Sequence, residues 1–536
     1  MNTTIPNKVI GVLIVVLFCV SAIPASASLR PGTQHIISPT GTDDFDPMVD
    51  QINVAVTIKQ IRALDNINFL KNPSFYVKVF INGQEFTSPV WKNQKYIYNP
   101  GWSATLSVPK DKEWVNITIQ LWDKGLIRDK LCDISPSHEG STVLNDTVVN
   151  IQYSLKTGHW MGDDWAFYWF SRWHHDENES QNQTSYTPFN DPLMFDPSGY
   201  GRLNGCDDGS TGKNDRDCEL WFDVTQTDPI GDGIPYWIKV NVYHLDPMFN
   251  YSDFDPNHDG IPITWDWKWG YDPFANDNHS LLDPDNDGLN NSKEYLTSQW
   301  GSDPYRKDLF IEMDQMAGGP NGEPASIFPT GAKELLRTAY DTHNIVYHLD
   351  DGTMGGVSGS EMVPFENLTN GSFEQGANQL EQIYEDYFLH GNENNWRHGV
   401  FHYGVVIYQC SLANGNAFGS DSFQISSKGL DEKAKTPLLK LYNPRNVRDV
   451  VFASAYMHET GHTLGLISAG VDNQNTKFPW MKDWWKFRNY KSVMNYGYMF
   501  KMGDYSDGSH GKNDFDDWDH LDLTYFDRQM SWGHHP

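Results

Sequence analysis

The sequence has few cysteines and few positive charges. Only five cysteines occur in 536 residues, and one of them, Cys19, lies in the first apolar run. Lys and Arg number 40 against 70 Asp and Glu, which gives a net charge of -30. This excess of negative charge excludes a nucleic-acid-binding protein, because phosphate backbones are bound through Lys and Arg. It suits a protein that binds cations.

Long apolar runs are also missing after the first thirty residues. Lys8 precedes an almost wholly apolar stretch over residues 9–23, and residues 25–27 form an Ala-Ser-Ala cleavage pattern. The stretch is short for a membrane span, so we expect a cleaved signal peptide over residues 1–27. An uncleaved anchor is the alternative. The mature chain is then expected to be secreted or at the cell surface, with no transmembrane segment.

Residues 28–155 are predicted to form an antiparallel β-sandwich, because apolar and polar residues alternate in several short runs. These runs are residues 52–58, 75–79 and 115–121. The strand end at Asp123, with Asp129 and Asp133 just beyond it, resembles a C2-type domain. These carboxylates are either calcium ligands at a loop tip or, the interpretation we favour, solvated loop residues.

The alternation fades over residues 156–222, which are rich in Trp, His, Asn, Gly and Asp. We predict an irregular connector here. Cys206 and Cys218 lie close together within it and are expected to form a disulfide in an oxidising compartment. The sequence leaves open whether Cys132 and Cys410 pair or remain thiols.

Residues 223–305 contain a repeated pattern of oxygen-bearing side chains. A calcium loop has ligands at positions 1, 3, 5 and 12, a backbone carbonyl ligand at position 7, and glycine at position 6. The first loop offers Asp255, Asn257, Asp259, the Ile261 carbonyl and Asp266; the second offers Asp283, Asp285, Asp287, the Leu289 carbonyl and Glu294. A degenerate copy begins at Asp228, with Ile230 and Lys239 at ligand positions. The block resembles thrombospondin type 3 repeats, which implies bound Ca²⁺ in place of a hydrophobic core.

The stretch from His458 to His462 reads H-E-x-x-H. Residues at i and i+4 share one face of a helix, so both imidazoles can bind one zinc ion. Glu459 is placed to take a proton from a water molecule and to pass it to a leaving amine. Helix-forming residues precede the motif, and Gly465 ends the predicted helix.

About thirty residues downstream, residues 492–496 read S-V-M-N-Y. H-E-x-x-H-x-x-G followed by such a turn resembles the metzincin metallopeptidases. The resemblance implies a zinc endopeptidase in which Met494 lies beneath the metal and Tyr496 contacts the metal or the transition state. It also implies an edge strand that aligns a polypeptide substrate through main-chain hydrogen bonds.

The third histidine of the metzincin motif is absent, and Ser468 stands in its place. No Glu follows Glu459, which excludes a thermolysin-like Glu ligand. The nearest replacement is Asp472, with His510 and His520 as more distant candidates. A site that no longer holds zinc is the remaining alternative.

Residues 306–536 are predicted to form the peptidase domain. We expect strands at 308–313, 344–349 and 401–408, helices at 332–340 and 374–388, and an edge strand within 417–425. This mixed order suits a metzincin-like α+β fold. The prediction is thus a multidomain, secreted, calcium-stabilised zinc endopeptidase. The alternative is a calcium-dependent surface adhesion or binding protein that carries an inactive peptidase-like domain.

Overall fold

The computed structural model describes residues 44–65, 67–68, 71–135, 147–163, 200–205, 216–354, 360–368, 373–410, 413–466 and 476–527. All of these belong to one unit of the chain, residues 44–536. The expected signal peptide lies outside them. Across the described ranges, no helix has the length and apolar character that a membrane span requires.

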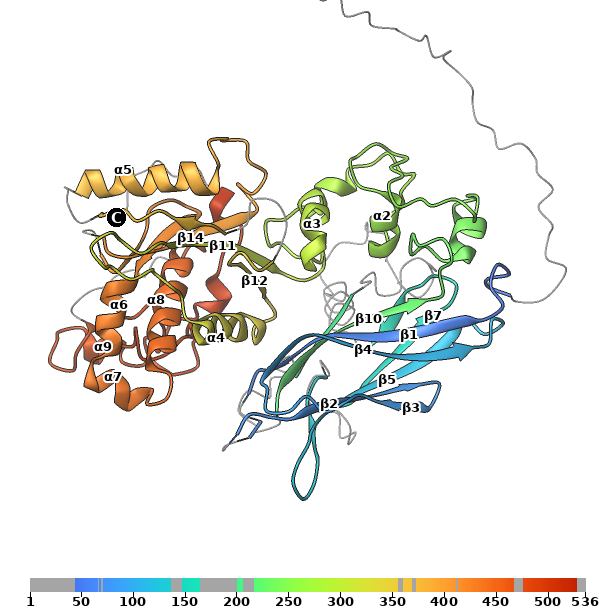
Figure 1. Ribbon diagram of the computed structural model, residues 1–536, viewed down its shortest axis with the longest axis horizontal. Helices are drawn as coiled ribbons and strands as arrows, with labels where there is room; N and C mark the ends of the chain where they lie inside the picture. Colours follow the sequence, from blue (N-terminus) through green and yellow to red (C-terminus); the bar gives the residue numbers. More distant parts are fainter. Residues whose placement is uncertain are drawn as a thin grey trace, which may run out of the picture. The chain divides into compact units, whose positions relative to one another are not determined.

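The N-terminal part consists of two antiparallel sheets that share one buried core (Figure 1). One sheet has the strand order β4-β1-β10-β9, and the other has β3-β2-β5-β7-β8 with β6 beside β5. Alternate residues of β1 and β5 are fully buried, as expected where one face of each sheet covers the core. The strands are β1 (Ile52–Ala63), β2 (Phe75–Ile81), β3 (Gln84–Thr87), β4 (Tyr96–Val108), β5 (Trp114–Asp123), β6 (Lys130–Cys132), β7 (Val149–Ser154), β8 (Trp160–Gly162), β9 (Gly201–Asn204) and β10 (Cys218–Gln226).

The prediction of an irregular connector over residues 156–222 is wrong for the described part of that segment. Strands β8, β9 and much of β10 lie within it, and β10 pairs with β1 from Ala63 opposite Cys218 to Val54 opposite Gln226. The first five residues of β10 are all buried. A strand that is covered on both faces shows no alternation of apolar and polar residues, so the sequence pattern failed here.

The middle block, residues 227–305, contains three loops, each followed by one short helix (Figure 1). The helices are η2 (Ile238–Val242), α2 (Ile263–Trp269) and α3 (Asn291–Thr297). Its buried apolar clusters are small: one centres on Ile238 and Ile263, another on Trp265 and Trp269. Such small clusters leave much of the stability of this block to polar contacts within its loops.

The C-terminal part is a mixed sheet of order β12-β11-β14-β16-β15, with β13 beside β11. All pairings are parallel except that of the edge strand β15, which runs antiparallel to β16. The elements are β11 (Asp308–Met316), α4 (Thr330–Asp341), β12 (Val346–Asp350), β13 (Met362–Val363), α5 (Phe373–Ile383), η5 (Tyr384–Phe388), β14 (Phe401–Ile407), β15 (Gly415–Ala417), β16 (Ser422–Ser426), α6 (Ser427–Ala434), α7 (Pro437–Tyr442), α8 (Val447–Thr463) and α9 (Trp484–Phe487). The expected elements are present, but the stretch 417–425 spans a hairpin rather than a single strand.

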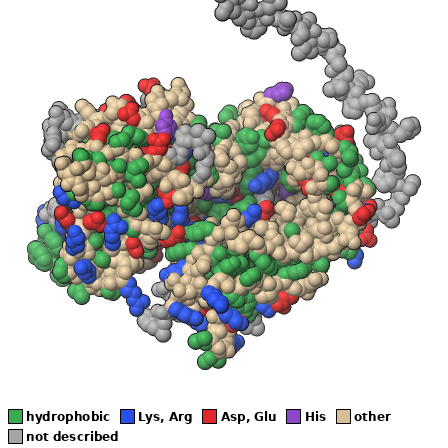
Figure 2. Space-filling view, in the orientation of Figure 1, with side chains coloured by type: hydrophobic (Ala, Val, Ile, Leu, Met, Phe, Trp, Pro, Cys, Tyr) green, Lys and Arg blue, Asp and Glu red, His purple; other side chains and the backbone are tan. Residues whose placement is uncertain are grey.

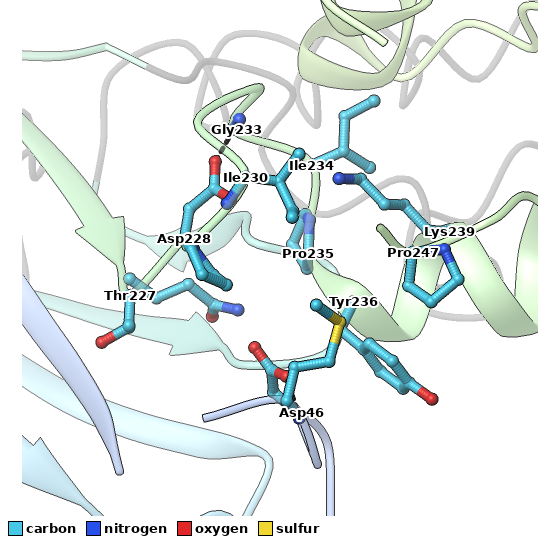
Figure 3. A pocket seen from close by; sticks show the side chains of 13 residues that line it. Asp46, Thr227, Asp228, Ile230, Gly233, Ile234, Pro235, Tyr236, Lys239 and Pro247 are labelled. Carbon is cyan, nitrogen blue, oxygen red and sulfur yellow. Dashed lines mark hydrogen bonds between the residues drawn. The ribbon is translucent and has the colours of Figure 1, made fainter. Parts of the chain in front are cut away.

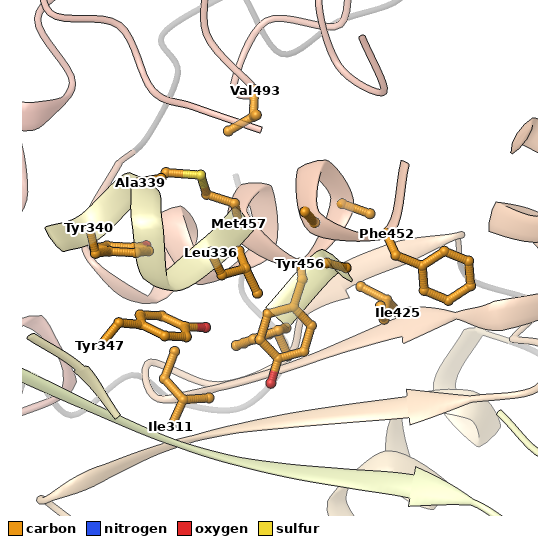
Figure 4. Packing of buried hydrophobic residues seen from close by; sticks show 14 of the residues in the cluster. Ile311, Leu336, Ala339, Tyr340, Tyr347, Ile425, Phe452, Tyr456, Met457 and Val493 are labelled. Atoms are coloured by element: carbon orange, nitrogen blue, oxygen red, sulfur yellow. The ribbon is translucent and has the colours of Figure 1, made fainter. Parts of the chain in front are cut away.

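Helices cover both faces of this sheet. Ile311 of β11 packs with α4 and α8 on one face, while Phe310 packs with α5 on the other. Figure 4 shows the first of these cores, in which Leu336, Tyr456 and Ile425 meet between the helices and the sheet. Residues 450–461 of α8 are all buried, so this helix is fixed against the sheet along most of its length.

Candidate metal centres

Helix α8 carries His458, Glu459 and His462 near its C-terminal end. The helix stops just beyond the second histidine, where Gly465 has a φ of +78°. A left-handed residue at this position ends a helix, and glycine adopts it without steric cost. The three side chains form one of the groups of ligand atoms that lie within 4.8 Å of one another.

The two histidine rings are oriented by backbone carbonyls. His458 Nδ1 lies 2.9 Å from the Val493 oxygen, and His462 Nδ1 lies 3.0 Å from the Leu466 oxygen. Each Nδ1 therefore donates its proton, which leaves both Nε2 atoms as acceptors. The Nε2 atoms are 3.2 Å apart. Two nitrogen ligands at about 2.05 Å from a tetrahedral zinc ion are separated by about 3.3 Å, so the donor set fits zinc.

The S-V-M-N-Y turn lies directly against this end of α8. Its Val493 carbonyl holds His458, as described above, and Met494 is fully buried. A Cβ on Gly461 would come within 2.9 Å of Met494 Sδ, so the sulfur lies against the helix between the two histidines. The Tyr496 ring centroid is 5.8 Å from that of His458. The structure thus brings Met494 and Tyr496 to the histidine pair.

Glu459 is almost completely buried, with 3% of its surface exposed. Its carboxylate lies so close to Gly415 in β15 that a Cβ at that position would clash with Oε1. The carboxylate is therefore enclosed between helix α8 and the edge strand β15 of the sheet. A glycine at 415 is needed for this close approach.

Two of the positions considered for a third zinc ligand, Ser468 and Asp472, lie in residues 467–475, outside the described residues. His510 Nδ1 is 2.9 Å from Asp514 Oδ2 and 3.6 Å from Asp507 Oδ1, and these three residues form a separate group. His520 Nδ1 is 2.6 Å from the Asp516 oxygen. In the described ranges, neither histidine joins the His458 group.

The three loops of the middle block share one local geometry. In each, the Asp at position 1 accepts the N–H of the position-6 glycine, whose φ is between +80° and +93°, and the Asp at position 5 accepts the N–H of position 7. These bonds run from Gly233 to Asp228, Gly260 to Asp255 and Gly288 to Asp283, and from Ile234 to Asp232, Ile261 to Asp259 and Leu289 to Asp287. Figure 3 shows the first of them beside a small pocket that this loop lines. What differs between the loops is the group that faces their carboxylates.

In the degenerate copy a lysine faces the loop. Lys239 Nζ lies 2.7 Å from Asp232 Oδ2, and both side chains are almost wholly buried. Lys239 stands at position 12, where a calcium loop has a carboxylate. Its ammonium therefore supplies the positive charge that an ion would otherwise bring.

In the first predicted calcium loop a histidine faces the carboxylates. His279 Nε2 lies 3.0 Å from Asp259 Oδ2 and 3.1 Å from Asp266 Oδ1, and its Nδ1 lies 2.6 Å from Asp277 Oδ1. Burial raises the pKa of Asp266 to about 7. Asp255, Asp259 and Asp266 do not form a group within metal-binding distance among the described residues, because the imidazole lies between two of them.

In the second loop no Lys, Arg or His among the described residues takes this place. Asp283, Asp285 and Asp287 form one group of ligand atoms, and Asp287, Glu294 and Asp308 form another. Burial, followed by mutual repulsion, raises the pKa values of Asp287 and Glu294 well above their ordinary values. Sequence reasoning missed Asp308, which it placed only as the first residue of a strand. The repeat pattern stops before it, and no local spacing links it to the loop.

Asp123, Asp129 and Asp133 are held by protein donors. Asp123 accepts the Ser74 N–H at 2.8 Å, Asp129 pairs with Lys124 at 2.8 Å, and Asp133 accepts the Ser135 N–H at 2.9 Å. Asp123 and Asp133 are almost fully buried, so the prediction of solvated loop carboxylates is wrong for these two. The three do not come together as a metal-binding group in the described ranges.

The sequence raised two cysteine pairings, Cys206 with Cys218 and Cys132 with Cys410. Cys206 lies outside the described residues, so the Cys206 to Cys218 disulfide stays a prediction. Cys132 is buried in the sandwich core and Cys410 in a core beside the C-terminal sheet. No disulfide joins these two described residues.

Comparison with known proteins leaves the family open. No family model and no curated protein matches the chain. Among solved structures it is similar to a C2 domain at 13% identity and a TM-score of 0.17, over 33% of this chain and 98% of that one. A C2 domain protein from Ramazzottius varieornatus matches at 6% identity and a TM-score of 0.17, over 32% and 88%. Human GIVD cytosolic phospholipase A2 matches at 9% identity and a TM-score of 0.17, over 33% and 16%. Similarity at this level carries no argument about function.

Proposed function

We propose that this chain is a secreted, zinc-dependent endopeptidase whose fold is stabilised by calcium. The observation that carries the proposal is the pair of Nε2 atoms of His458 and His462, 3.2 Å apart beside the buried carboxylate of Glu459. Two carbonyl-oriented imidazoles next to a carboxylate are suited to metal-assisted hydrolysis. The resemblance of the flanking turn to metzincins points to the same reaction.

The residues of the site have distinct roles in this proposal. His458 and His462 would hold the zinc ion, which when bound would act as a Lewis acid towards the scissile carbonyl. Glu459 takes the proton from the attacking water and returns it to the departing amine nitrogen. Its burial keeps this carboxylate out of bulk water, where proton transfer would be less directed. Tyr496 beside His458 offers a hydroxyl to the oxyanion.

A polypeptide is the substrate class that the sheet edge favours. Strand β15 is the last strand of its sheet and is only three residues long, and Glu459 lies against it. The free edge of such a strand can pair with an extended peptide through main-chain hydrogen bonds, which places a scissile bond near the carboxylate. Side-chain preferences of the substrate do not follow from this contact.

Hydrolysis of casein by the purified mature chain in calcium buffer tests the proposal. We expect turnover that 1,10-phenanthroline abolishes and that Glu459→Ala lowers by about 10²- to 10⁴-fold, the range for loss of a general acid–base group. Thermal unfolding of the variant controls for folding. Wild type that is folded, loaded with zinc and as inert as Glu459→Ala would contradict the proposal. In that outcome the second candidate function, a calcium-dependent adhesion or binding protein, is favoured, because the third histidine of the metzincin motif is absent.

A further inference from the structure

We propose that the second loop holds two divalent cations of the calcium type, and that Asp308 at the start of β11 binds one of them. The inference rests on the calcium part of the proposed function and is independent of peptidase activity. The ion bound by Asp308 would connect the second loop, in the middle block, to the C-terminal sheet.

The first argument is the way the ligands divide. In a calcium loop with one ion, the position-12 carboxylate completes the shell formed by positions 1, 3 and 5. Here Glu294, at position 12, groups instead with Asp287 and Asp308. Asp283 and Asp285 form a separate group with Asp287. Two neighbouring ions that share the Asp287 carboxylate account for both groups.

The second argument is charge. Five carboxylates meet here, and none of the four in the loop, Asp283, Asp285, Asp287 and Glu294, forms an ion pair with a described Lys or Arg. Asp308 Oδ1 is 2.5 Å from His348 Nε2, and Arg202 and Arg306 lie near enough to interact with Asp308 electrostatically, but neither arginine forms an ion pair with the four loop carboxylates. One Ca²⁺ would leave a large buried negative charge, whereas two nearly balance it.

The third argument is an oxygen atom without a partner. Glu294 is completely buried; its Oε2 accepts a hydrogen bond from Ser302, but its Oε1 has no hydrogen-bond partner. Asp285 Oδ2 is in the same condition. Withdrawing a carboxylate oxygen from water without a partner is costly, and one cation in each of the two groups removes that cost.

Asp308 contacts both the second loop and the C-terminal sheet. Its N–H donates to Asp287 Oδ2 at 2.7 Å, and its carboxylate faces His348 in β12. Strand β11 pairs with β12 on one side and β14 on the other. An ion bound by Asp287, Glu294 and Asp308 therefore connects the loop to an interior strand of the C-terminal sheet.

Calorimetric titration of Ca²⁺ into the full mature chain after chelation tests this inference. We expect Asp308→Asn and Glu294→Gln each to bind one calcium ion fewer than wild type, while Asp283→Asn removes a different one, so that Asp283→Asn with Asp308→Asn loses two. Asp314→Asn, a buried change on the same face of β11, is the matched control and should keep the wild-type number.

The unfolding temperature in excess calcium provides a second readout if a variant folds poorly. We expect Asp308→Asn to lose most of the increase that calcium gives to wild type. Unchanged stoichiometry and affinity in both Asp308→Asn and Glu294→Gln would overturn the role of Asp308. Loss of the same single ion in all three variants would overturn the two-ion site. If wild type binds no calcium, the calcium part of the proposed function fails as well.

Discussion

The proposed zinc site on α8 and the proposed calcium site in the second loop are built in opposite ways. At the helix, carbonyl oxygens of Val493 and Leu466 hold two histidines, so the donor nitrogens face one another before any ion arrives. At the second loop, buried carboxylates face one another, and their pKa values are raised well above the ordinary range. The two histidines of the first site are held by hydrogen bonds within the protein, whereas the second site contains a surplus of like charge.

This difference separates the roles of the two metals. A site whose histidines are held by hydrogen bonds within the protein should lose its chemistry without the ion but keep its shape. A site built from crowded carboxylates needs cations to stay folded. The other two loops support this view, because a basic side chain faces the carboxylates of each: Lys239 in one and His279 in the other.

Selective removal of each metal should produce the largest difference. We expect removal of calcium with EGTA to expose the amides of residues 283–308 to hydrogen exchange, because carboxylate repulsion opens the loop. Zinc removal with 1,10-phenanthroline in calcium buffer should leave these amides and those of α8 protected. Hydrogen exchange followed by mass spectrometry measures both. Equal protection of the amides of residues 283–308 after the two treatments would contradict the difference between the two sites.

Removing the lysine of the degenerate loop should have a large effect that calcium cannot reverse. Lys239→Met leaves the buried Asp232 carboxylate without its ion-pair partner, which costs about 3–5 kcal/mol in the free energy of unfolding. Urea unfolding at low and high calcium measures this cost. The matched control is Lys239→Met with Asp232→Asn, which removes both charges and should recover most of the loss. A cost that disappears in high calcium would show that this loop binds the ion after all.

A smaller effect concerns pH, through a carboxylate away from both metals. Glu312 in β11 is fully buried, and burial raises its pKa to about 9 even though Arg397 Nε lies 2.7 Å away. The same guanidinium also pairs with Asp350 at 2.6 Å, so one cation serves two carboxylates.

The folded state therefore keeps a proton on Glu312 that the unfolded state releases above about pH 4.5. Its stabilising contribution is complete below that pH and is lost as the pH rises to about 9, by up to about 1.4 kcal/mol per pH unit. We expect Glu312→Gln to flatten the dependence of stability on pH between 6 and 9 in saturating calcium. An unchanged slope in urea unfolding would exclude this group as its source.

Much of the local structure followed from the sequence, because its signals are local. Helix α8, the turn at Met494 and the three loops depend on spacings of a few residues, and the structure forms each of them. Strand β10 was missed because both of its faces are buried. Asp308 was missed because it reaches the second loop through the fold and not through the repeat. His279 was missed because it follows, in the sequence, the loop whose carboxylates it faces.

The most direct test of the proposed activity is a titration of zinc into the metal-depleted chain in calcium buffer, with casein hydrolysis followed at each step. The account predicts that activity rises in proportion to the added zinc and stops increasing at one equivalent of zinc per chain. Glu459→Gln should bind the same equivalent of zinc with the same affinity but remain inactive. If Glu459→Gln regains hydrolysis as wild type does, or if wild type binds zinc and stays inert, the proposed endopeptidase mechanism is contradicted.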